Sequence, residues 1–161
     1  MEPHKMKTVL IALDYDPTAQ KVAETGFSLA KSMGAEIILL HVVSDPIYYS
    51  STEYSPVMGF TGYMDTVPLQ LDNIAGLKNA SQYFLDNSKH HLGDETIKTV
   101  IKEGDLADSI LKTAKKMGVD IIVMGSHSRK WLEDIVLGSS TRDVLMKSTI
   151  PLFIVPTKKR K

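Results

Sequence analysis

Residues 120–141 read DIIVMGSHSRKWLEDIVLGSST, and the order of residue types in this stretch indicates the fold. It opens with a short apolar run, Asp120–Met124, which is typical of a buried strand. Gly125 then permits a turn, and a helix is predicted to begin near Gly138-Ser139 and to end before Pro151. A strand, a turn and a helix in this order form the repeating unit of an α/β protein.

Four further short apolar runs, rich in β-branched residues, occur elsewhere in the chain. They are Thr8–Leu13, Glu36–Val43, Thr96–Lys102 and Leu152–Val155. Several of the runs are apolar throughout instead of alternating with polar residues. Continuous runs of this kind fit strands that are buried on both faces of a parallel sheet.

Helical patterns lie between these runs. Asp16-Pro17 predicts the first helix, with the aspartate as N-cap and the proline at the first helical position, and Gly34 closes it. A second helix is predicted over about Leu69–Leu92 from the spacing of its apolar residues. A third begins after Gly104-Asp105 and stops at Gly118.

The alternation of five strands with four helices predicts the fold class. A chain of 161 residues is expected to form one domain, residues 1–161. We predict a doubly wound α/β sandwich with a five-stranded parallel sheet and about four helices. Such sheets bind ligands at the carboxyl ends of their strands, which here follow Leu13, Val43, Met124 and Val155.

The composition excludes several classes of function. The chain has 19 Lys and Arg against 19 Asp and Glu, so its formal net charge is zero. Nucleic acids and acidic membranes are bound through a basic field, so we expect neither as a partner. No apolar run approaches the roughly 20 residues of a membrane span. The absence of cysteine excludes disulfides, thiolate catalysis and cysteine-ligated metals. We predict a soluble cytoplasmic protein.

Two segments depart from the α/β pattern. Residues 44–67 form a long connection that contains five aromatic residues among prolines and glycines. A connection of this length is either a surface loop, a lid over a site or a surface that binds a partner. Residues 157–161 form a basic tail, which we expect to be solvated.

The residues after the fourth predicted strand carry a pattern suited to phosphate. Gly125 allows close backbone approach at the carboxyl end of that strand, and Gly138 stands at the start of a helix, where exposed amides and the helix dipole favour anions. Ser139, Ser140 and Thr141 add hydroxyl donors, although they could equally be N-caps of the helix. The pattern is neither a Walker loop nor a GxGxxG dinucleotide motif. A structural turn followed by a helix cap would explain the same residues.

With these motifs, the chain resembles the universal stress proteins of the ATP-binding type. The signature of that family is G-x2-G-x9-G-[ST], and this chain has Gly125-x2-Ser128-x9-Gly138-Ser139. The flanking stretches KTVLIALDYDPTA, EIILLHVV and LEDIVLGSSTRDVLMKSTIPLFIVP match as well. The resemblance covers almost the whole chain and implies an adenine nucleotide alpha hydrolase-like fold that binds ATP with Mg²⁺ or Mn²⁺ as a regulatory module in the stress response.

The resemblance also implies a set of nucleotide-binding residues. Asp14 would face the ribose or a phosphate-bound metal ion, and no metal site is implied from protein side chains alone. Val42 would contact adenine through its backbone, and the residues from Gly138 onward would hold the triphosphate. The full set is Leu13, Asp14, Val42, Met124, Gly125, His127, Ser128, Gly138, Ser139, Ser140 and Thr141.

Two positions depart from the family pattern. Ser128 stands where ATP-binding members have a second glycine. If that backbone were left-handed, a side chain would cost about 1–2 kcal/mol, so ATP binding would be weakened. Tyr15 and Asp16 stand where the family has small residues. These departures keep open an alternative, a nucleotide-free module of the stress response that works through protein contacts.

The sequence contains no residue that is an evident water-activating base, so we predict no catalytic residue and at most slow ATP hydrolysis. An enzyme of the wider superfamily that adenylates a substrate would carry a Ser- or Gly-rich loop after the first strand, where this chain has Asp14-Tyr15-Asp16-Pro17. His41 lies inside a predicted strand and is interpreted as a packed core histidine. The resemblance further suggests a homodimer formed by antiparallel pairing of the last strand, Leu152–Val155.

Overall fold

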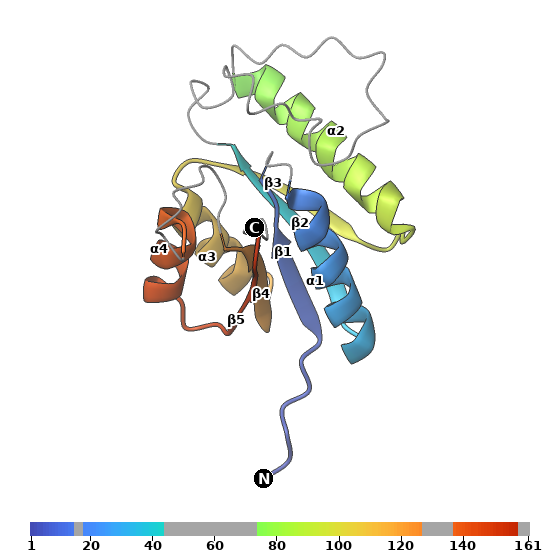
Figure 1. The fold of residues 1–161 in the computed structure, drawn as a ribbon, viewed down its shortest axis with the longest axis vertical. Coiled ribbons are helices and arrows are strands. Elements are labelled where there is room, and N and C mark those ends of the chain that lie inside the picture. The colour runs from blue at the N-terminus through green and yellow to red at the C-terminus, as the bar shows by residue number, and fades with distance from the viewer. Residues whose placement is uncertain (15–17, 44–73, 127–136, 158–161) are drawn as a thin grey trace, which may run out of the picture.

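Strands and helices alternate along the whole described part of the chain (Figure 1). The computed structural model describes residues 1–14, 18–43, 74–126 and 137–157. The elements in chain order are β1 (Thr8–Ala12), α1 (Ala19–Met33), β2 (Glu36–Val43), α2 (Ile74–Leu92), β3 (Lys98–Glu103), α3 (Leu106–Lys116), β4 (Ile121–Gly125), α4 (Ser139–Lys147) and β5 (Leu152–Val155).

The five strands form one parallel sheet in the order β3-β2-β1-β4-β5. The chain therefore winds outward from β1 in one direction through β2 and β3, and then returns to add β4 and β5 on the other side. The predicted doubly wound α/β sandwich with a five-stranded parallel sheet is confirmed. The two halves meet at the boundary between β1 and β4.

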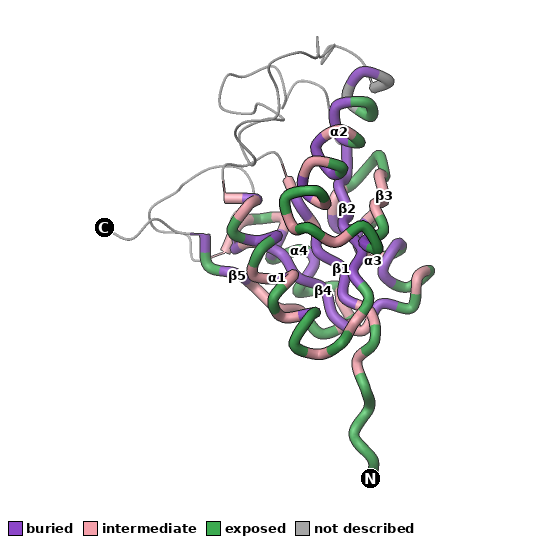
Figure 2. The backbone as a smooth tube through the Cα atoms, turned by 90° about the vertical axis from the view of Figure 1, so that its right-hand side faces the viewer, coloured by how far each residue is buried: buried purple, intermediate pink, exposed green. Residues whose placement is uncertain are grey.

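Helices α1 and α2 pack on one face of the sheet, and α3 and α4 pack on the other (Figure 1). The side chains of Val9 and Ile11 belong to the core on the α1 side, whereas Leu10 between them belongs to the core on the α3 side. All three are fully buried, and Figure 2 shows the same burial along the central strands. Because both faces need apolar side chains, the strand sequences are continuously apolar.

Helix α1 begins later than its sequence predicts. Its N-cap is Thr18, and Ala19 is the first residue of the helix and is buried in the core. The prediction that Asp16 is the N-cap and Pro17 the first helical residue is therefore wrong by two positions. The Thr18 carbonyl accepts the first helical bond, from the N–H of Val22 at 3.2 Å.

The other helix limits follow the predicted signals closely. Gly34 ends α1 in the left-handed conformation, at φ 65°. Asp105 is the N-cap of α3, and its carboxylate accepts the N–H of Asp108 at 3.0 Å. Helix α2 begins at Ile74, and residues 69–73, which the prediction also included, are outside the described residues.

Gly26 allows α1 to lie unusually close to the sheet. A Cβ atom at this position would be 2.8 Å from Cδ1 of Ile11 and 3.1 Å from Cγ1 of Val123. These two side chains come from β1 and β4, the central pair of strands. The glycine therefore fixes the distance of α1 from the two strands whose ends form the site described below.

Of the two segments that depart from the α/β pattern, the structure describes only one residue, Thr157. The long connection of residues 44–67 lies outside the described residues, as do residues 158–161 of the basic tail. Thr157, which the sequence assigns to that tail, is instead buried, with only 4% of its surface exposed. Among the described helices, none is both long and apolar enough to cross a membrane.

Candidate functional site

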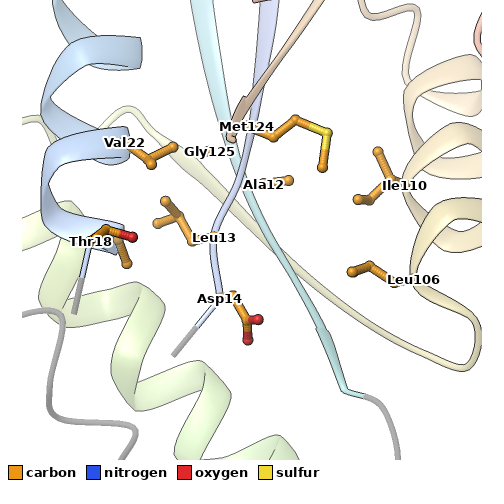
Figure 3. Close-up of a pocket in the computed structure, with 10 residues that line it drawn as sticks. Ala12, Leu13, Asp14, Thr18, Val22, Leu106, Ile110, Met124 and Gly125 are labelled. Atoms are coloured by element: carbon orange, nitrogen blue, oxygen red, sulfur yellow. The ribbon is translucent and has the colours of Figure 1, made fainter. Parts of the chain in front are cut away.

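A pocket opens at the carboxyl ends of β1 and β4, the point at which the sheet changes winding direction (Figure 3). Its cavity volume is about 40 Å³, and it is partly open to solvent. In doubly wound sheets this crevice is where ligands bind, because the connections from the two central strands lead to opposite faces. The lining residues are Ala12, Leu13, Asp14, Thr18, Ala19, Val22, Leu106, Ile110, Met124 and Gly125.

The walls of the pocket are mostly apolar. Met124 from β4 faces Leu106 and Ile110 of α3, while Leu13 and Val22 lie on the α1 side (Figure 3). Asp14 is the one acidic residue among the lining residues, and Figure 3 shows its carboxylate turned toward the side formed by α3. A mostly apolar lining with a few polar groups is typical of a pocket that binds a small molecule.

The end of β1 is held in place from β2. The Leu13 N–H donates to the carbonyl of Leu40 at 2.9 Å, and Nδ1 of His41 donates to the carbonyl of Leu13 at 2.8 Å. His41 is 1% exposed and meets the ring of Phe84 edge-on, with 6.0 Å between ring centres. The prediction that His41 is a packed core histidine is confirmed. Its hydrogen bond also fixes the backbone immediately before Asp14.

Val42 lies apart from this pocket. It is 3% exposed, belongs to the core on the α3 side, and is paired with Lys102 of β3. It is not among the residues that line the pocket. A backbone contact of Val42 with adenine stays a prediction.

The structure brings the two glycine turns together at the end of β4. The Gly138 N–H donates to the carbonyl of Ser126 at 2.7 Å, and the Thr141 hydroxyl donates to the carbonyl of Gly125 at 2.8 Å. Residues 125 and 126 therefore lie directly beside the first turn of α4, although the sequence between the two turns is long. His127 and Ser128, both predicted site residues, lie outside the described residues.

Helix α4 begins in a way that leaves its first turn suited to an anion. Its N-cap is Gly138, so the interpretation of Ser139, Ser140 or Thr141 as N-cap is wrong. The glycine offers no capping side chain, and the first turn contains no acidic residue. At φ −63° and ψ 156° the backbone of Gly138 does not require glycine. Ser139 is exposed, Ser140 is half-buried, and both stand at the positive end of the helix dipole.

Thr141 has a different position from the two serines. Its side chain is fully buried, and its hydroxyl donates to the Gly125 carbonyl. This bond ties α4 to the end of β4.

The described residues do not form a metal site by themselves. Within residues 1–14, 18–43, 74–126 and 137–157, no three His, Cys, Asp or Glu side chains are grouped closely enough to hold one. Asp14 is the acidic side chain available at the pocket. Oxygen atoms of a bound phosphate are ligands of the kind that Mg²⁺ and Mn²⁺ accept, and they would add to Asp14.

Sequence reasoning missed the α3 wall and the role of the chain after β5. Leu106 and Ile110 line the pocket because β1 and β4 present their carboxyl ends beneath the start of α3, which only the sheet order reveals. The available signal was Gly104-Asp105, which places the start of α3 at the same sheet edge. Nothing in the sequence marks Thr157 as a partner of Ser126.

The sequence model of the universal stress protein family matches residues 5–156. This chain belongs to the universal stress protein family. Universal stress protein MJ0577 of Methanocaldococcus jannaschii is 30% identical over 155 residues, which are 94% of this chain and 96% of the relative. Universal stress protein YxiE of Bacillus subtilis is 29% identical over 150 residues, 91% of this chain and 97% of the relative.

Solved structures of universal stress proteins share the fold. The structure of MJ0577 superimposes with a TM-score of 0.72 at 28% identity, covering 98% of this chain and 100% of that one. A universal stress protein in complex with cAMP gives a TM-score of 0.63 at 17% identity, covering 96% of this chain and 100% of that one. One from Archaeoglobus fulgidus in complex with dAMP gives 0.57 at 19% identity, covering 94% and 98%.

Proposed function

We propose that this universal stress protein binds ATP, with Mg²⁺ or Mn²⁺ on the phosphates, as a cytoplasmic regulatory module of the stress response with little or no hydrolysis. The observation that carries the proposal is the hydrogen bond from the Gly138 N–H to the Ser126 carbonyl, at 2.7 Å. It places an uncapped helix N-terminus beside the mouth of an apolar pocket. A base in the pocket and phosphates at the helix would use both features at once.

The adenine ring would occupy the apolar pocket. Met124, Ile110 and Leu106 form the apolar part of the pocket lining that would contact it. The carboxylate of Asp14 stands at the edge of the same pocket, where a ribose hydroxyl could donate to it. His41 would support this contact by fixing the backbone at Leu13.

The phosphates would lie at the start of α4. The first-turn amides, the hydroxyls of Ser139 and Ser140, and the positive end of the helix dipole all favour negative charge there. The absence of a side chain at Gly138 would let a phosphate approach the backbone closely. Thr141 would act through Gly125, because its hydroxyl is already used there. His127 and Ser128 are proposed to complete the site from the sequence motif.

We propose that a divalent cation binds here as a partner of the nucleotide. When bound, it would neutralise phosphate charge and take oxygen ligands from the phosphates, with Asp14 the protein carboxylate in reach of the pocket. The pocket lining offers no second carboxylate and no histidine to activate a water molecule. We infer a binding protein with little or no ATP hydrolysis.

Two relatives support an adenine nucleotide as ligand. One universal stress protein of the same fold has been crystallised with cAMP and another with dAMP. Both ligands contain an adenine, a five-membered sugar and one phosphate. The apolar pocket followed by a helix N-terminus offers a place to each of these three parts.

A homodimer is proposed from the position of β5. This strand lies at the edge of the sheet, paired only with β4 among the described strands. Its residues Leu152, Phe153 and Ile154 are apolar and only half-buried. Apolar edge strands are usually paired or covered, and antiparallel pairing of two copies would do so. Light scattering at micromolar concentration should report twice the chain mass, and a monomeric mass would contradict the dimer.

A graded series at Gly138 tests nucleotide binding. The backbone angles of Gly138 accept any residue, so Gly138→Ala and Gly138→Val should fold, which circular dichroism would verify. Titration calorimetry should show Mg-ATP affinity falling from wild type through alanine to valine, by about tenfold or more at valine. Unchanged affinity in folded Gly138→Val protein would contradict this site.

The nucleotide-free alternative depends on Ser128, which replaces the motif glycine. Ser128→Gly beside wild type separates the two functions. Binding by both proteins supports the ATP-binding module, whereas binding by the variant alone supports the protein-interaction module.

A further inference from the structure

The buried hydroxyls of Ser126 and Thr157 lie 3.1 Å apart, where the turn after β4 meets the chain that leaves β5. Ser126 is 7% exposed and Thr157 is 4% exposed. The Thr157 N–H also donates to the Ser126 hydroxyl oxygen, at 3.0 Å. The hydroxyl and the N–H of Thr157 therefore both contact the hydroxyl oxygen of Ser126.

The backbone of Ser126 is held from two sides as well. Its N–H donates to the Val155 carbonyl at 2.9 Å, and its carbonyl accepts the Gly138 N–H. Ser126 is therefore the residue at which the end of β4, the start of α4 and the chain after β5 converge. A displacement of any one of these three segments would change the hydrogen bonds of the other two.

The chain after β5 is itself anchored from the opposite side. Lys21 of α1 donates from Nζ to the Pro156 carbonyl at 2.6 Å. Pro156 and Thr157 thus bridge α1 and the turn after β4.

We propose that Thr157 is a positioning residue that holds the phosphate-binding turn through Ser126, and that it couples this turn to edge strand β5. We call Ser126 and Thr157 together the hydroxyl clasp. The positioning role rests on the proposed function, since the turn is the one assigned to phosphate. The hydroxyl clasp orients the Ser126 carbonyl toward Gly138, so losing it lets the start of α4 move relative to Gly125. In return, nucleotide binding should protect the Thr157 amide from exchange.

The test compares Thr157→Val, which removes the hydroxyl at nearly constant volume, with Thr157→Ser, which keeps it. Thr149→Val is the matched control, because Thr149 is exposed and outside the clasp. In the nucleotide-free protein, we expect hydrogen exchange at the Ser126 and Gly138 amides to be about threefold to tenfold faster in Thr157→Val. Thr157→Ser and Thr149→Val should exchange as wild type does.

Mg-ATP affinity provides the second readout. It should fall about threefold to tenfold in Thr157→Val, recover in Thr157→Ser, and stay unchanged in Thr149→Val. Ser126→Ala should reproduce the loss, and the double variant should be no worse than Ser126→Ala alone. If Thr157→Val is poorly folded, the comparison of Ser126→Ala with wild type replaces it.

The outcomes separate the clasp from the proposed function. Unchanged exchange at both amides, or exchange that rises equally throughout the protein, would overturn the clasp. If hydrogen exchange changes only at these amides while ATP affinity is unaltered, the positioning role is overturned. If wild type binds no nucleotide, the proposed function and the positioning role both fail, and exchange alone decides whether the clasp couples the turn to β5.

Discussion

At the amino end of the central strands, the Asp120 carboxylate accepts three hydrogen bonds from the described part of the chain. The N–H groups of Lys7 and Thr8 donate to its Oδ2 at 2.8 and 3.0 Å. Nε2 of His4 donates to its Oδ1 at 3.0 Å. At the carboxyl end of the same strands, the first turn of α4 has neither a capping side chain nor an acidic residue. One edge of the sheet is supplied with an anion by the chain itself. At the carboxyl edge, α3 is capped by the Asp105 carboxylate, whereas the start of α4 has no such group. Under the proposed function, a phosphate of the ligand lies at the start of α4.

The amino edge contains a second carboxylate of the same kind. Asp94 accepts from Nζ of Lys31 at 2.6 Å and from the N–H and hydroxyl of Thr96, at 2.9 and 2.6 Å. The pKa of Asp94 is lowered to about 2, chiefly by the bond from Lys31. The pKa of Asp120 is lowered too, first by the bond from His4 and then by the Lys7 N–H. Hydrogen bonds to the charged form cause both shifts.

The largest expected effect comes from Gly26, which lets α1 lie close to β1 and β4. Gly26→Val would force branched atoms into the space of Ile11 and Val123. We expect a loss of about 3 kcal/mol in the free energy of unfolding, measured by urea denaturation. Ser28→Val, an exposed position on the same helix, is the control and should change little. Equal stability of the two variants would contradict the close packing of α1.

The next effect should be confined to the amino edge. Asp120→Ala removes the shared acceptor of the Lys7 and Thr8 amides, and should lower the free energy of unfolding by about 2 kcal/mol. Mg-ATP affinity should stay as in wild type, because the pocket lies at the opposite end of the strands. A large loss of affinity in the folded variant would show that the two edges are not independent.

A smaller effect should appear at the carboxyl edge. Leu106 and Leu111 are both half-buried on α3 and contact the same core, but only Leu106 lines the pocket. Leu106→Ala should weaken Mg-ATP binding by about threefold to tenfold through loss of apolar contact. Leu111→Ala should lose stability without losing affinity. Equal affinities for the two variants in calorimetry would place the base elsewhere.

The smallest effect is a dependence of stability on pH. Because the pKa of Asp94 is lower in the folded protein, the unfolded chain binds more protons between about pH 4 and pH 2. The stabilisation from Asp94 is therefore complete above about pH 4 and is lost as the pH falls toward 2. Asp94→Asn should flatten the stability profile in this range, measured by urea denaturation at several pH values. An unchanged profile would contradict the Lys31 interaction.

The sequence predicted those features of the fold that depend on nearby residues. Gly34 and Asp105 end and begin helices where predicted, because a left-handed glycine and a capping aspartate act within one turn. The predicted start of α1 was wrong, since the N-cap of this helix is Thr18. Asp120 was predicted as part of a strand, yet its side chain accepts hydrogen bonds from residues more than a hundred positions away.

The site was predictable only in part, because some of its contacts join residues that are distant in the sequence. Gly125 and Gly138 are marked by their spacing, and the structure brings them together. Thr141 was assigned to phosphate, whereas its buried hydroxyl is bound to Gly125. That bond depends on how α4 docks on the sheet, which the local sequence does not specify. The Ser126 and Thr157 contact joins positions 31 residues apart and requires the register of β4 with β5.

The central claim is that the carboxyl edge of the sheet binds the phosphates of a nucleotide. Calorimetric titration of nucleotide-stripped wild-type protein with Mg-ATP tests this claim. The account predicts saturable binding of one nucleotide per chain in wild type and in Asp120→Ala, and about tenfold or greater weakening in Gly138→Val. If folded wild-type protein gives no heat of binding on titration with Mg-ATP, the account is contradicted. Equal binding by wild type and Gly138→Val would contradict it as well.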